Sequence, residues 1–136
     1  MKNILIVPLL LTAIACAAPP KRIAAIVTEY RHNSHADVIV GRLLQTYTLD
    51  DKGKQPNLKL VSLYTDQVPK NDTSRKWAAK YGVPIYETVE ETLTLGTGKL
   101  AVDGVLLVAE HGQYPKNATG NTIFPKRRLF NEVQKV

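Results

Sequence analysis

The chain has 136 residues, of which 44% are hydrophobic and 22% charged, a composition that excludes a largely disordered protein and suits one compact domain. Eighteen basic and 12 acidic residues give a net charge of +6, but the Lys and Arg residues are spread along the sequence, which argues against a nucleic-acid-binding face. The single cysteine excludes an intrachain disulfide.

The N-terminal stretch "MKNILIVPLLLTAIACAAPPKR" has the layout of a secretory signal peptide, which we expect to span residues 1–18. A lysine near the start precedes an apolar run, Ile4–Ile14, that is short for a bilayer span. "AIAC" around Cys16 resembles the lipobox of bacterial lipoproteins. We therefore expect export to the periplasm or the medium, with a lipid anchor at Cys16 as the one route to a membrane, and a folded domain over 19–136.

Strands and helices alternate after the Pro19-Pro20 break. The sequence predicts continuously apolar strands at 22–30 and 102–110, and further strands at 58–66 and 83–87. Ser34 with Asp37, and Thr88 with Glu91, form capping boxes before helices at 35–47 and 89–95. A third helix runs from about Asp72 to Gly82, and a fourth covers 126–136.

This order predicts an α/β, Rossmann-like parallel sheet with helices on both faces and the strand order 3-2-1-4. The last predicted helix runs to the final residue without a cap. We therefore expect the domain to be incomplete at its C-terminus.

Two segments carry a resemblance to a known family. "SRKWAAKYGVPIYETVEETL" followed by "VDGVLLVAEHGQYP" resembles the N-terminal Rossmann domain of the glucose-fructose oxidoreductase/inositol dehydrogenase (Gfo/Idh/MocA) family. The resemblance covers most of 22–115. It implies an NAD- or NADP-dependent sugar or polyol oxidoreductase, with Asp66 at the end of the second strand as the ribose-binding acid. Asp66 also fits an exposed turn residue, because "TDQVPKND" is rich in turn formers.

The sequence departs from the family at the phosphate-binding turn. "TEYRHNSHAD" replaces the glycine fingerprint, which lets a backbone approach a pyrophosphate at a helix N-terminus. The helix start is retained through Ser34, whereas bulky residues replace the glycines. The family's lysine-bearing catalytic segment and its second domain have no counterpart in the sequence.

Polar residues follow the first and fourth predicted strands, which are neighbours in this topology. His32 and His35 follow the first strand, and Glu110 and His111 end the fourth, so all three histidines are predicted at one sheet edge. These four are the candidate catalytic residues. The residues expected to contact a cofactor are Thr28, Arg31, Asn33, Ser34, Asp66, Glu110 and His111.

Three interpretations of this cluster remain open. It is a structural or non-catalytic ligand site in which His35 caps a helix and Glu110 pairs with Arg31. It is an acid–base site in which Arg31 grips an anionic group. Or it binds zinc or iron, although H-x-x-H in a turn is an unspecific pattern and we assign no metal ligand.

Two functions follow from these observations. The first is an exported Gfo/Idh/MocA-like oxidoreductase domain that binds a dinucleotide or a sugar-like ligand at the carboxyl edge of the sheet. The second is a non-catalytic Rossmann-like binding or structural module that has lost its cofactor site. The missing glycines favour the second, and Asp66 and the alternating strands favour the first.

Overall fold

The structure of the protein, a computed structural model, describes residues 18–45, 48 and 52–136. The predicted signal segment up to residue 17, including Cys16, lies outside the described residues. Within the part that is described, no helix is both long enough and apolar enough to cross a bilayer.

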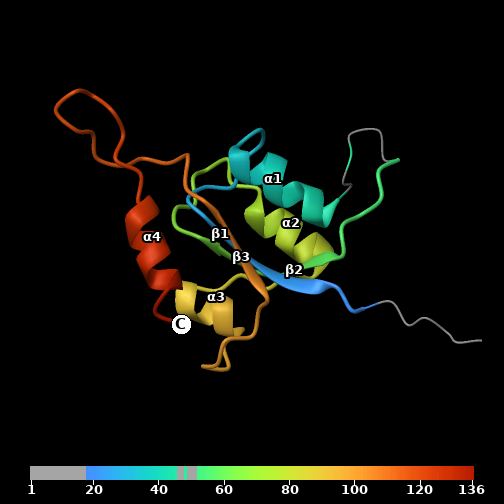
Figure 1. Ribbon diagram of the computed structural model, residues 1–136. Coiled ribbons are helices and arrows are strands. Elements are labelled where there is room, and N and C mark those ends of the chain that lie inside the picture. Colours follow the sequence, from blue (N-terminus) through green and yellow to red (C-terminus); the bar gives the residue numbers. More distant parts are fainter. Residues whose placement is uncertain (1–17, 46–47, 49–51) are drawn as a thin grey trace, which may run out of the picture.

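The core of the fold is a parallel sheet of β1 (Lys21–Val27), β2 (Leu58–Thr65) and β3 (Gly104–Val108), in the order β2-β1-β3. All of its strands run parallel, and helices flank both faces (Figure 1). The predicted α/β, Rossmann-like fold is therefore confirmed. The first, second and fourth predicted strands are the three that form the sheet.

The predicted strand at 83–87 is reduced to a single bridge. Ile85 pairs in parallel with Leu63 of β2, on the side of the sheet where a third strand was expected. The Pro84 carbonyl accepts a hydrogen bond from the Leu63 amide, and the Tyr86 amide donates to the Leu63 carbonyl. Pro84 has no amide hydrogen to donate, which limits how far such a ladder extends.

Helices α1 (His35–Leu44) and α2 (Ser74–Tyr81) lie on one face of the sheet, and α3 (Val89–Thr94) and α4 (Lys126–Val133) lie on the other (Figure 1). Strand β1 supplies both cores, because successive side chains of a strand point to opposite faces. Ala25 and Val27 pack beneath α1 and α2, whereas Ala24 and Ile26 pack beneath α3 and α4.

The start of α1 explains how the first loop is held. The Ser34 hydroxyl accepts hydrogen bonds from the backbone amides of Asp37 and Arg31, each at 3.2 Å. The Asp37 carboxylate returns to the amide of Asn33 at 3.0 Å rather than to that of Ser34. The predicted cap is therefore present, but its return bond is shifted by one residue, which fixes the turn that carries Arg31.

Candidate functional site

The carboxyl ends of β1 and β3 lie side by side, and the loops that follow them are joined by hydrogen bonds. The Thr28 amide donates to the Val108 carbonyl at 3.1 Å, and the Thr28 hydroxyl accepts from the His111 amide at 3.3 Å. Thr28 is buried. Its hydroxyl therefore joins the two loops instead of facing a ligand.

Arg31 lies at the centre of a polar cluster between these loops, which we call the Arg31 cluster: Glu29, Arg31, His35 and His111. The guanidinium donates to the Glu29 carboxylate at 3.3 Å and to Nδ1 of His111 at 3.3 Å. The ring of His35, from the first turn of α1, stacks on the ring of His111 with centroids 4.8 Å apart. Contacts from two loops and a helix thus hold Arg31 and His111 in place.

The surroundings of His111 favour its neutral form. Burial lowers the pKa of His111 below its ordinary value, and the nearby charges of Arg31 and His35 lower it further. Because Nδ1 accepts a hydrogen bond from Arg31, the neutral ring carries its proton on Nε2. His111 therefore offers an N–H donor to a ligand at neutral pH.

Glu110 is paired with Lys126 of α4 through a 2.6 Å contact. Its pKa is lowered chiefly by the hydrogen bond from Lys126. The sequence-based pairing of Glu110 with Arg31 is wrong, because Arg31 turns to Glu29, which is the nearer acid on its own loop. The expectation that His35 caps α1 is also wrong, since Ser34 takes that role.

A shallow cleft of about 400 Å³ opens beside the Arg31 cluster. Its wall includes Glu29, Arg31, Glu110 and His111 from the two strand ends, which the sequence had placed at this edge. The remaining lining residues are Pro69, Asn71, Gly112, Gln113 and Phe124. The cleft thus combines paired charges, amide groups and one aromatic ring.

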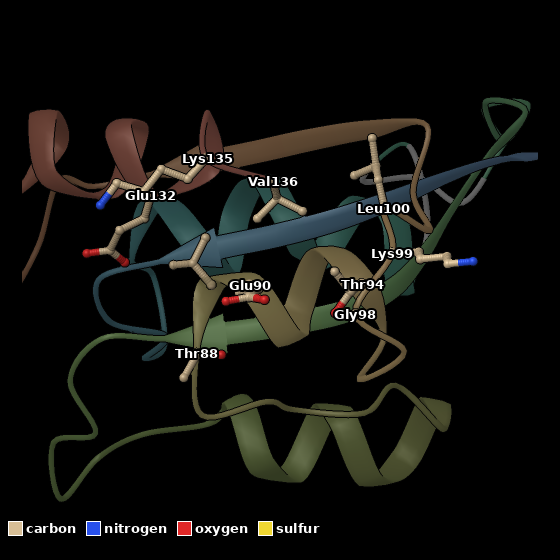
Figure 2. Close-up of a pocket in the computed structure, with 10 residues that line it drawn as sticks. Thr88, Glu90, Thr94, Gly98, Lys99, Leu100, Glu132, Lys135 and Val136 are labelled. Carbon is tan, nitrogen blue, oxygen red and sulfur yellow. The ribbon is translucent and has the colours of Figure 1, made fainter.

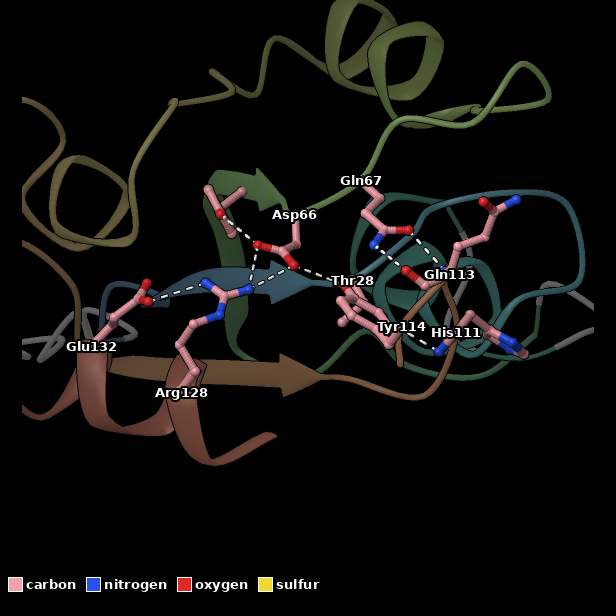
Figure 3. Close-up of polar contacts among 9 residues, drawn as sticks. Thr28, Asp66, Gln67, His111, Gln113, Tyr114, Arg128 and Glu132 are labelled. Carbon is pink, nitrogen blue, oxygen red and sulfur yellow. Dashed lines mark hydrogen bonds and ion pairs between the residues drawn. The ribbon is translucent and has the colours of Figure 1, made fainter. Parts of the chain in front are cut away.

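Asp66 directly follows β2, and its side chain is surrounded by protein groups (Figure 3). Its carboxylate accepts hydrogen bonds from the hydroxyl of Tyr64 at 2.8 Å and from that of Tyr114 at 2.7 Å. Arg128 of α4 donates to both carboxylate oxygens at 2.6 Å. The Asp66 side chain is only 11% exposed. A ribose hydroxyl would have to displace one of these partners to reach it.

The remaining residues of "TEYRHNSHAD" divide between core and solvent. Tyr30 is fully buried among the side chains under α1, so it does not stand in the crevice. The His32 side chain is 84% exposed and lies 3.7 Å from Asp37, away from the other two histidines. Asn33 has a positive φ of 58°, and Ser34 is buried at the cap. The interpretation that all three histidines gather at the cleft is therefore wrong for His32.

Two residues that line the cleft, Gln113 and Phe124, have no signal in the sequence. The side chain of Gln67 holds the backbone of Gln113 through two hydrogen bonds. Its nitrogen donates to the Gln113 backbone carbonyl at 3.0 Å, and its oxygen accepts from the Gln113 backbone amide at 2.9 Å. Phe124 reaches the cleft from the end of the long loop before α4. Only the fold brings these residues together, because no motif links such distant positions.

A metal centre finds no support in the geometry. In the described part of the chain, no group of three or more His, Cys, Asp or Glu side chains converges so as to hold an ion. His111 directs Nδ1 at a cation, Arg31, which is the opposite of what a metal ligand requires.

A second cavity, of about 630 Å³, lies between α3 and the end of α4 (Figure 2). Glu90, Lys99, Glu132 and Lys135 contribute its charged groups. Three of these side chains are exposed and Glu132 is half-buried, and no polar group there is buried without a partner. We regard the Arg31 cleft as the candidate site because its polar groups are partly buried and held by one another.

Comparison of the chain with protein-family models, with curated proteins and with solved structures finds no significant match.

Proposed function

We propose that the chain is a Rossmann-like, non-catalytic binding module that takes a small, uncharged, sugar-like ligand in the cleft beside the Arg31 cluster. One observation carries this proposal: the groups that a dinucleotide would need are engaged by the protein itself. Asp66 is held by Arg128 and two tyrosines, and the turn after β1 is filled by Glu29 and Arg31.

The charge balance of the cleft favours an uncharged polyol over an anion. Arg31 is paired with Glu29, and Lys126 is paired with Glu110. With His111 neutral, these pairs leave no net charge to attract an anion. A sugar hydroxyl both donates and accepts, so it can bridge the members of such fixed pairs. Phe124 adds an apolar face against which the C–H groups of a sugar ring can pack.

Ligand screening tests the proposal directly. We expect saturation-transfer NMR with a panel of neutral monosaccharides and polyols to show binding that Arg31→Ala weakens at least about tenfold, the loss of one good polar anchor. His32→Ala is the matched control, because His32 neighbours Arg31 but is turned to solvent. Equal losses in both variants, or no binding by any member of the panel, would contradict the proposal.

The Gfo/Idh/MocA-like oxidoreductase domain is the second candidate. It is favoured by the parallel sheet and by an acidic residue, Asp66, at the end of β2. Calorimetric titration with NAD and NADP distinguishes the two. Micromolar binding that Asp66→Ala abolishes would support this candidate, whereas no heat up to millimolar concentrations would favour the sugar-binding module.

Export of the protein also remains our proposal. The apolar run Ile4–Ile14 and the small residues after it support removal of residues 1–18, with Cys16 as the lipidation alternative. N-terminal sequencing and intact-mass measurement of protein from the membrane and soluble fractions would identify the cut. An intact Met1 on all recovered protein would contradict export through a cleaved signal.

A further inference from the structure

A second cleft, of about 210 Å³, adjoins the one beside the Arg31 cluster. Three residues, Glu29, Pro69 and Gln113, line both clefts, and Gln67 and Val68 complete the smaller one. The three shared residues follow β1, β2 and β3, respectively. Because β1 lies between β2 and β3, the two clefts are parts of one groove over the end of β1, between the loops that follow its two neighbours. Ligands of open α/β sheets bind at such carboxyl ends of the strands.

Hydrogen bonds hold both sides of this groove to the end of β1. On the β2 side, the Gln67 amide donates to the Thr28 carbonyl at 2.8 Å. On the β3 side, the Thr28 hydroxyl accepts from the His111 amide at 3.3 Å. The Gln67 side chain also joins one side to the other through Gln113 (Figure 3). The fold therefore sets the spacing between the two clefts, and a ligand that occupies both must match it in length.

Glu29 lies at the bottom of the groove and has an acceptor that the protein does not use. Its side chain is only 9% exposed, and its Oε2 accepts from Nε of Arg31 at 3.3 Å. No group among the described residues donates to the other oxygen, Oε1. Oε1 is not sealed from the groove, because in this part of the chain only the Tyr30 hydroxyl is both sealed and unpaired. The charge of Arg31 disfavours a cation at Oε1, and the carboxylate disfavours an anion, so the position suits a neutral hydroxyl donor.

We propose that the groove binds a neutral disaccharide, with one ring in each cleft and a hydroxyl that donates to Oε1 of Glu29 where the clefts meet. This inference rests on the proposed sugar-binding function and adds the length of the ligand. The larger cleft offers the Nε2–H of His111 and the side-chain amide of Asn71. The smaller cleft offers Val68 and Pro69 to the C–H groups of a ring. Two linked rings make both sets of contacts but lose translational freedom only once, so they bind more tightly than either ring alone.

NMR titration of the ¹⁵N-labelled chain tests this inference. The probes are maltose, cellobiose and lactose, each compared with its constituent glucose or galactose. We expect at least one disaccharide to bind about tenfold more tightly than its constituents. The amides of Gln67 and Val68, in the smaller cleft, should shift with the disaccharide only. The amides of His111 and Gly112, in the larger cleft, should shift with both kinds of sugar.

Substitutions separate the length of the ligand from binding itself. Val68→Trp fills the smaller cleft, so it should lower the disaccharide affinity to that of the monosaccharide and leave the monosaccharide affinity unchanged. Lys70→Trp is the matched control, because it adds the same ring to the same loop but outside both clefts. Glu29→Gln keeps the shape of the side chain and an acceptor for Arg31, and should weaken the disaccharide about tenfold. Circular dichroism of this variant verifies that it is folded.

Three results would overturn the inference and leave the sugar-binding function standing. They are disaccharides that bind no more tightly than their constituents, amide shifts confined to the larger cleft, and a Val68→Trp variant that retains the full disaccharide affinity. A folded Glu29→Gln variant with unchanged affinity would also overturn it, because the free oxygen of Glu29 would then have no part in binding. An absence of binding by every sugar would overturn the inference and the proposed function together.

Discussion

Arg128 of α4 donates to both carboxylate oxygens of Asp66 at 2.6 Å, and so ties the last helix to the end of β2 across 62 positions of sequence. Tyr64 and Tyr114 complete the shell of the same carboxylate. An acid that the sequence marked as a ribose contact thus holds together the sheet, the long loop and α4.

Asp66→Ala should destabilise the protein by roughly 1–3 kcal/mol, because it leaves two tyrosine hydroxyls and a guanidinium without their acceptor. The lower end of that range is expected, since Arg128 is half exposed and water screens its charge. Urea unfolding followed by circular dichroism measures the change. Glu132→Ala, which removes the other partner of Arg128, should cost less, and an equal cost would contradict the central role of Asp66.

Acid should weaken the fold through the same carboxylate. Burial alone would raise the pKa of Asp66, but hydrogen bonds from Arg128, Tyr114 and Tyr64 outweigh this effect and lower the pKa below the ordinary value of an aspartate. The folded-state pKa is therefore below the unfolded one. The ionised Asp66 carboxylate therefore stabilises the folded state fully above the unfolded pKa of about 3.9. This stabilisation is lost as the pH falls through the folded pKa. The slope of unfolding free energy against pH in this range should flatten in Asp66→Asn.

His111 should titrate below the ordinary histidine value, and Arg31→Gln should raise its pKa. Burial lowers the pKa of His111 first, and the charge of Arg31 adds to it. The depressed folded pKa means that stability falls as the pH drops below about 6.5, where the unfolded chain takes up the proton first. NMR titration of the imidazole signals measures the pKa of His111 in the original protein and in Arg31→Gln. An unchanged His111 titration in Arg31→Gln would show that the contact with Arg31 is absent in solution.

Gly112→Ala should destabilise the loop after β3 by about 1–3 kcal/mol. Gly112 has φ of 126°, and an added Cβ would lie 2.5 Å from the Tyr114 ring. Gly120→Ala separates the two causes, because Gly120 also has a positive φ but has nothing within 4 Å of an added Cβ. Thermal unfolding should show a larger loss for Gly112→Ala, and equal losses would assign the whole effect to backbone strain.

Tyr30→Phe should leave stability unchanged or raise it by up to about 1 kcal/mol. Within the described residues, the buried Tyr30 hydroxyl has no hydrogen-bond partner, and burial raises the pKa of Tyr30 well above its usual range. Removing an unpaired hydroxyl removes its desolvation cost. A loss of more than 1 kcal/mol on chemical denaturation would instead reveal a partner such as an ordered water.

The elements of this fold follow from local patterns. Ser34 and Thr88 mark helix starts because their hydroxyls accept amide hydrogens within the same turn, and Gly82 ends α2 with a φ of 65°. The continuous apolar runs predict parallel strands, and they form β1 at the centre of the sheet and β3 at its edge. The strand expected at 83–87 does not form, and Ile85 makes only an isolated bridge to Leu63. The neighbouring Pro84 has no amide hydrogen with which to extend the pairing.

The candidate site was only partly predictable. The contact between Arg31 and His111 could be predicted, because the two residues follow β1 and β3, which are neighbours in the sheet. Which acid pairs with which base was not predictable, because Glu29 and Glu110 are both near Arg31 in the topology and side-chain direction decides between them. The same limit applies to His32, whose backbone is at the sheet edge but whose ring faces solvent.

The hydrogen bonds between the Gln67 side chain and the Gln113 backbone affect how a ligand would bind. Two hydrogen bonds fasten the loop after β3 to the loop after β2, so this wall of the cleft is set before any encounter. A ligand then loses little binding free energy to ordering the protein, and its affinity depends on direct contacts. Association should accordingly be a single kinetic phase, linear in ligand concentration, with weak affinity expressed as rapid release.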